Sequence, residues 1–84
     1  MLSNDQRSKL KVFVKTYLYL KGKATTKELT IAVNECDIGL NIGITSAEMG
    51  RFLMSLTYRK NKNYMGTLRY EKNSKNARVY YLEG

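Results

Sequence analysis

Apolar residues recur with helical spacing in three stretches of the chain. Residues Leu10–Leu18, Leu29–Cys36 and Met49–Leu56 each place apolar side chains at i, i+3, i+4 and i+7, which puts them on one face of a helix. The second helix should end at Glu35 or Cys36. Because Cys36 lies on the apolar stripe, we expect a small buried side chain there and not a reactive thiol. The pattern predicts three amphipathic helices that share one core.

Polar residues ahead of each stripe mark where the helices begin. In Ser3–Gln6, Thr25–Glu28 and Thr45–Glu48, a hydroxyl residue is followed three positions later by Gln or Glu, the signature of a capping box. The first helix should end at Gly22 after about 17 residues, because glycine readily takes the left-handed conformation that ends many helices. These signals divide the first 60 residues into helix, short connection, helix, longer connection and helix.

Two features do not follow the apolar stripes. Val12, Tyr19 and Leu20 fall partly outside the stripe of the first helix. They would contact the core or form a small dimer patch, and we expect core contact. Residues 37–44 contain two glycines and four Ile or Leu residues, which predicts a turn whose apolar side chains pack into the core.

The last third of the chain alternates in the manner of β-strands. Two alternating runs flank the polar turn at residues 73–76, which predicts a β-hairpin over 67–82. A lone hairpin is only marginally stable in water, so we expect Tyr70, Tyr80 and Tyr81 to pack it onto the helices. The small and β-branched residues 24–26 would add a short edge strand.

Length and composition restrict the classes of function. The 84 residues form a single domain, 1–84. One cysteine and no histidine exclude a Cys/His zinc site and Ser/His or Cys/His catalytic pairs. We therefore expect no enzyme, no catalytic or metal-binding residues, no cofactor and no small-molecule ligand. The lone cysteine fits a cytoplasmic protein, and no apolar run is long enough to be a membrane span or the core of a signal peptide.

Positive charge is concentrated toward the C-terminus. The chain has a net charge of +8. Residues 1–50 hold seven Lys or Arg against five Asp or Glu, a net of +2, whereas residues 51–84 hold eight against two, a net of +6. This asymmetry is typical of a protein that contacts an anionic partner such as a nucleic acid. The alternative is a solvated basic surface that only aids solubility.

The order of these elements resembles that of winged-helix DNA-binding domains. The matching segments are Thr25–Leu29 at the start of the second helix, Thr45–Leu53 at the start of the third, and Arg78–Leu82 in the last strand. The resemblance implies an α+β fold with three helices and a C-terminal two-stranded hairpin, the wing. It also implies binding to double-stranded DNA, with the third helix, 46–59, in the major groove and the wing, 67–82, on an adjacent groove or on phosphate.

Eleven residues carry donors or charge where this resemblance implies DNA contact. Arg51 is the candidate for a bidentate guanine contact, although a surface arginine paired with Glu48 or Ser55 explains it equally well. The cations after the third helix and around the 73–76 turn would contact phosphate. The full set is Ser46, Arg51, Ser55, Tyr58, Arg59, Lys60, Lys62, Arg69, Lys72, Lys75 and Arg78.

The leading hypothesis is a small sequence-specific DNA-binding protein, most simply a transcriptional regulator. A homodimer or an array on repeated sites would help so small a protein cover enough base pairs. One alternative is an accessory factor in plasmid transfer or replication, in keeping with a mobile element, a virus or a compact prokaryotic genome. The others are a winged helix that binds protein, and a binder of RNA or single strands through tyrosine stacking.

Overall fold

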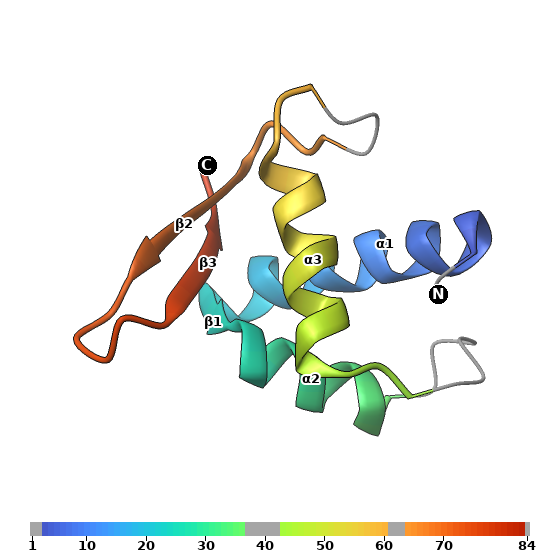
Figure 1. The fold of residues 1–84 in the computed structure, drawn as a ribbon, viewed down its shortest axis with the longest axis horizontal. Helices are drawn as coiled ribbons and strands as arrows, with labels where there is room; N and C mark the ends of the chain where they lie inside the picture. The colour runs from blue at the N-terminus through green and yellow to red at the C-terminus, as the bar shows by residue number, and fades with distance from the viewer. Residues whose placement is uncertain (1–2, 37–42, 61–63, 84) are drawn as a thin grey trace.

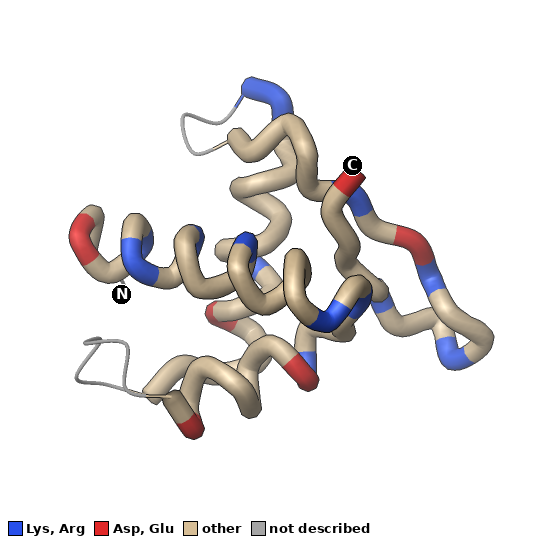
Figure 2. Tube along the Cα trace, turned by 180° about the vertical axis from the view of Figure 1, so that it is seen from behind, with Lys and Arg blue, Asp and Glu red and all other residues tan. Residues whose placement is uncertain are grey.

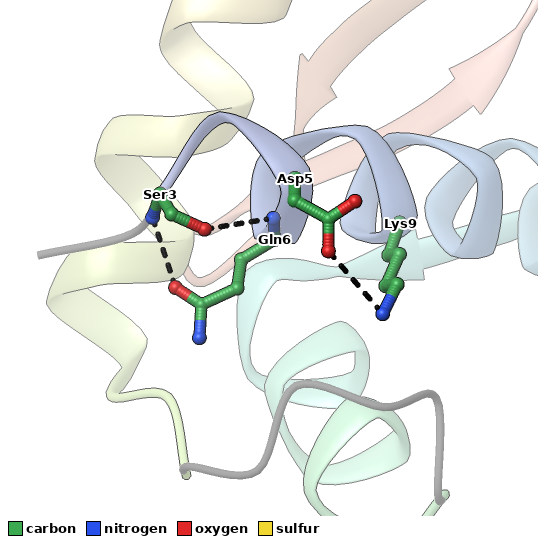
Figure 3. Close-up of polar contacts among 4 residues, drawn as sticks. All are labelled: Ser3, Asp5, Gln6 and Lys9. Atoms are coloured by element: carbon green, nitrogen blue, oxygen red, sulfur yellow. Dashed lines mark hydrogen bonds and ion pairs between the residues drawn. The ribbon is translucent and has the colours of Figure 1, made fainter.

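All three helices begin at the residues that the capping boxes predicted. The computed structural model describes residues 3–36, 43–60 and 64–83. Helices α1 (Asn4–Lys21), α2 (Thr26–Glu35) and α3 (Ser46–Thr57) have Ser3, Thr25 and Thr45 as their N-caps. Each cap hydroxyl accepts the backbone N–H three residues later at 3.1 Å. In α1 the Gln6 side-chain oxygen in turn accepts a hydrogen bond from the Ser3 N–H at 2.9 Å (Figure 3).

Three strands complete the fold, in the chain order α1, β1, α2, α3, β2, β3. They are β1 (Lys23–Thr25), β2 (Leu68–Lys72) and β3 (Arg78–Leu82). All pairings are antiparallel and β3 lies in the centre, with Ala24 and Tyr70 both opposite Tyr80. The described chain is therefore an α+β domain of three helices and a three-stranded sheet (Figure 1).

The prediction of a two-stranded hairpin is wrong in one respect. The expected short strand does form, one residue earlier than 24–26, and it joins the hairpin along the free edge of β3. Pairing with β1 satisfies backbone N–H and C=O groups that β3 would otherwise leave open. The hairpin is thus part of a sheet that connects it to the turn after α1.

The core lies between the three helices and one face of the sheet. The sheet contributes Ala24, Leu68 and Tyr80, each at most 1% exposed. The apolar stripes of the helices supply most of the rest, namely Leu10, Val14, Leu18, Leu29, Val33, Met49, Phe52, Leu53 and Leu56. Gly50 of α3 faces α2, where a Cβ added to it would lie 4.0 Å from the Thr26 methyl group. This is an ordinary van der Waals distance, so an alanine would fit here and the packing of α2 against α3 does not require the glycine.

Several expected core residues lie outside the core. Cys36 is exposed, because α2 ends at Glu35 and the chain turns into extended geometry at its C-cap. Tyr70 is 43% exposed, because β2 extends past the helices toward the hairpin tip. Val12, Tyr19 and Leu20 are exposed on α1, so the expectation of core contact is wrong for all three. The predicted packing of residues 37–42 lies outside the described residues.

No helix within the described ranges combines the length and the apolarity needed to cross a membrane.

Candidate nucleic-acid interface

The exposed face of α3 is a narrow stripe with one cation. Ala47, Arg51, Met54 and Tyr58 follow one another at i, i+4, i+7 and i+11, and all four are exposed. Met54 is 51% exposed and Tyr58 is 61% exposed. The opposite face is buried in the core, so this stripe is the surface that α3 can present to a partner.

Arg51 is available for an external contact. Within the described residues it forms no hydrogen bond or ion pair. The neighbouring Glu48 carboxylate serves the cap instead, accepting from the Thr45 N–H and the Thr45 hydroxyl at 3.1 Å each. The Thr45 backbone and hydroxyl hydrogen bonds lower the pKa of Glu48, and Arg51 contributes least. The proposed pairing of Arg51 with Glu48 or Ser55 is not formed.

The two serines of α3 are less suited to reading bases. Ser55 donates its hydroxyl to the Phe52 carbonyl at 2.6 Å, so its proton is used within the helix. Ser46 is exposed at the first helical position, but helical spacing places it roughly 140° around the axis from Arg51. Neither serine joins the outward stripe.

A short basic segment follows α3. The helix ends at Thr57, two residues before the predicted end at Arg59, and the backbone of Tyr58 is extended. Arg59 and Lys60 follow and are exposed, whereas Lys62 lies outside the described residues. The two described cations lie just beyond the carboxyl end of the helix, which favours positive charge.

The hairpin tip is a well-defined turn that carries Lys75. The Asn73 side-chain oxygen accepts from the Lys75 N–H at 2.9 Å and from the Ala77 N–H at 3.0 Å. Asn76 takes the left-handed conformation, with φ of 64°, which asparagine tolerates better than most residues. Figure 1 shows the tip projecting away from the helices. Lys75 therefore lies on a fixed loop at the far end of the hairpin.

The other wing cations differ in how firmly the protein holds them. The Arg78 guanidinium lies over the Tyr70 ring, 4.6 Å from its centroid, and a hydrogen bond with Tyr80 raises its pKa. Arg69 Nε pairs with the Glu83 carboxylate at 2.7 Å and its Nη1 donates to the carbonyls of Gly66 and Leu68, so these two nitrogens are used within the chain.

Lys72 differs from these two arginines. It is exposed and pairs in register with Arg78 at the end of the ladder. Among the described wing cations, Lys72 and Lys75 are thus the exposed ones with neither an ion pair nor a contact to an aromatic ring.

The charges form three blocks along the chain, which the division at residue 50 concealed. Residues 1–27 hold seven Lys or Arg against Asp5, a net of +6. Residues 28–50 hold no cation and four acids, a net of −4, and residues 51–84 have a net of +6. The acidic block begins within α2, after Lys27, and ends within α3 just before Arg51, so an anionic partner is disfavoured at the amino end of α3 and favoured from Arg51 onward.

The structure therefore brings together only part of the predicted site. Arg51 and Tyr58 share the stripe on α3, with Arg59 and Lys60 at its carboxyl end. Lys75 projects from the sheet in a different part of the molecule (Figure 1). Met54 was not predicted as a site residue, although its spacing from Arg51 and Tyr58 was visible in the sequence.

Comparison of the chain with protein-family models, with curated proteins and with solved structures gives no significant match.

Proposed function

We propose that this protein is a winged-helix domain that binds double-stranded DNA. In this arrangement α3 enters the major groove and the tip of the β2–β3 hairpin contacts phosphate. The observation that carries the proposal is the unpaired Arg51 on the outward stripe of α3, on the same chain as a projecting hairpin with no acid between Lys72 and Arg78.

The charge blocks refine how the helix would approach the duplex. Glu28, Glu35 and Glu48 would repel phosphate near the amino end of α3. Contacts should therefore begin at Arg51 and continue through Tyr58 to Arg59 and Lys60. In this geometry Arg51 is the base-reading residue and the later cations hold the backbone.

Selection of bound sequences from a random duplex pool tests the proposal directly. A preferred site should emerge, and Arg51→Ala should reduce discrimination between this site and a mutated one by about five- to a hundredfold. Lys75→Ala should weaken binding to both sites by a similar factor. Binding to no duplex at low salt refutes the proposal. Specificity lost with Lys75→Ala but kept with Arg51→Ala would make the hairpin the reader instead.

A second candidate function rests on the apolar part of the same stripe. Met54 and Tyr58 are more exposed than apolar residues usually are, and such side chains are common at protein interfaces. If the partner is a protein, Met54→Ala should weaken its binding and duplex affinity should not exceed that of any comparably basic protein. Stronger binding to single strands or RNA than to duplex would favour stacking on tyrosines. Regulation of transcription and assistance in plasmid transfer or replication are both compatible with DNA binding.

A further inference from the structure

The most exposed large apolar side chains of the described residues lie together on α1. Val12 is 65% exposed, Tyr19 is 80% exposed and Leu20 is 73% exposed. They are spaced i, i+7 and i+8, which places them on one side of the helix, opposite Leu10, Val14 and Leu18 in the core. Figure 2 views the molecule from behind and shows α1 in front of the other elements. This surface, which we call the α1 outer face, is not covered by the rest of the chain.

Lysines flank the α1 outer face and restrict what can cover it. Lys9 and Lys15 are exposed on either side of Val12, and Lys9 also forms a 3.3 Å ion pair with Asp5. Residues Asn4–Lys21 hold five Lys or Arg against one Asp. Packing two α1 outer faces against each other would therefore bring lysines against lysines. The charge favours a partner surface that is both apolar and acidic.

Such a surface exists on α2 of the same protein. Ile31 is 47% exposed on α2, and Glu28 and Glu35 lie at i−3 and i+4 from it. All three side chains share one side of the helix, opposite Leu29 and Val33 in the core. We call this the α2 outer face. The exposed Lys27 lies at i−4 from Ile31 on the same side, so this face carries two carboxylates and one ammonium group and is net acidic.

The two outer faces also match in spacing. With a rise of 1.5 Å per residue, Glu28 and Glu35 lie about 10 Å apart along α2, on either side of Ile31. Lys9 and Lys15 lie about 9 Å apart along α1, on either side of Val12. One contact between the faces can thus bring Ile31 against Val12 with the carboxylates of α2 near the lysines of α1, while Tyr19 and Leu20, about 10–12 Å further along α1, extend the apolar surface.

We propose that the α1 outer face of one copy docks on the α2 outer face of the next, so that copies associate head to tail. Because the contact joins two different surfaces, each added copy leaves one face of each kind free. The protein would therefore form chains rather than closed two-fold dimers. This inference does not depend on DNA binding, although an anionic duplex would reduce the repulsion between copies that each carry +8.

Association should be measured near 0.15 M salt. At this ionic strength the screening length is about 8 Å, which weakens the general repulsion between copies more than the attraction between charges in contact. Sedimentation velocity over a range of concentrations should show reversible growth beyond the dimer. The variant Val12→Ser with Tyr19→Ser and Leu20→Ser removes the apolar side chains of the α1 outer face, and Ile31→Lys places a cation against its lysines. Each should lower the association constant about tenfold or more. All four positions are exposed in the monomer, so neither variant should lose its fold.

Mixing the two variants distinguishes head-to-tail contact from other arrangements. The serine variant retains its α2 outer face and Ile31→Lys retains its α1 outer face, so the mixture should form a one-to-one pair and nothing larger. Thr67→Lys adds the same charge at an exposed position away from both faces and should associate as the wild type does. The proposal is overturned if the wild type stays monomeric at its highest soluble concentration. It is also overturned if Ile31→Lys alone still forms stable dimers, since such dimers would not need the α2 outer face.

Discussion

Removal of the Lys75 charge tests whether the hairpin tip contacts phosphate. Lys75 lies on a turn that Asn73 holds in place, and its side chain forms no ion pair within the described residues. Lys75→Ala therefore changes one charge without disturbing the turn, whose hydrogen bonds come from backbone N–H groups. The variant should fold as the wild type does and differ only in its electrostatic contribution to binding.

The magnitude follows from the number of exposed cations without an ion pair that are proposed to contact phosphate, which leaves out Arg51 as the base-reading residue. Arg59, Lys60, Lys72 and Lys75 are exposed and have no ion pair among the described residues. Four phosphate contacts give a slope of log K against log salt of roughly −3.6, which is about a 150-fold loss of affinity between 50 and 200 mM salt. Without Lys75 the slope should rise to about −2.7. Raising the salt from 50 to 200 mM should then lower the affinity only about 40-fold.

Fluorescence anisotropy with a labelled duplex that accommodates a single copy measures both slopes. Lys15→Ala is the matched control, because it removes one exposed lysine from the α1 outer face, away from the proposed DNA side. The control should shift the slope far less than Lys75→Ala does. Equal shifts for the two variants would show that binding depends on net charge alone. An unchanged slope for Lys75→Ala would show that the hairpin tip lies away from phosphate, which would refute the proposed geometry.

Three further outcomes are expected. Arg51→Ala should reduce discrimination between the selected site and a mutated site, as measured by competition binding, while leaving the salt slope within about 0.9 of the wild-type value. Leu53→Ala should lower the free energy of unfolding by about 2–5 kcal/mol in urea denaturation, because Leu53 is fully buried between the helices. Thr45→Ala should lower the free energy of unfolding by about 1 kcal/mol, and the free energy of unfolding should then fall less steeply toward acid pH. Because the cap lowers the pKa of Glu48, the stability that the ionised Glu48 contributes is complete above the ordinary carboxyl pKa. This stability is lost as pH falls through the lowered pKa.

The sequence predicted local features more reliably than the surroundings of individual side chains. The capping boxes, the helical stripes and the 73–76 turn depend on neighbouring residues, and each formed as expected. The third strand was expected only as an option, because its pairing depends on β3, more than 50 residues later in the chain. The exposure of Cys36 and Tyr70 depends on where elements end relative to the core, which periodicity alone does not specify.

The candidate site was also predicted only where its features depend on local spacing. The sequence placed Arg51 on the outward face of α3, because helical spacing determines which residues share a face. It did not indicate that Arg69 would bond to Glu83 or that Arg78 would stack on Tyr70, since both contacts depend on strand register. Counting charge in three blocks instead of two would have located the acidic surface of α2 from the sequence.

The central place of β3 in the sheet also sets the order in which this fold can be completed. β1 lies between the first two helices, but its pairing partner is the last strand of the described chain. During synthesis the helices can form as they emerge, whereas β1 must wait until residue 81 has been made before its register with β3 is complete. The loop-closure entropy of this long-range pairing must be overcome before β1 and β3 gain their hydrogen bonds. A nascent chain that stops before β3 should leave the core side of α1 and the edge of β1 open to chaperones and proteases.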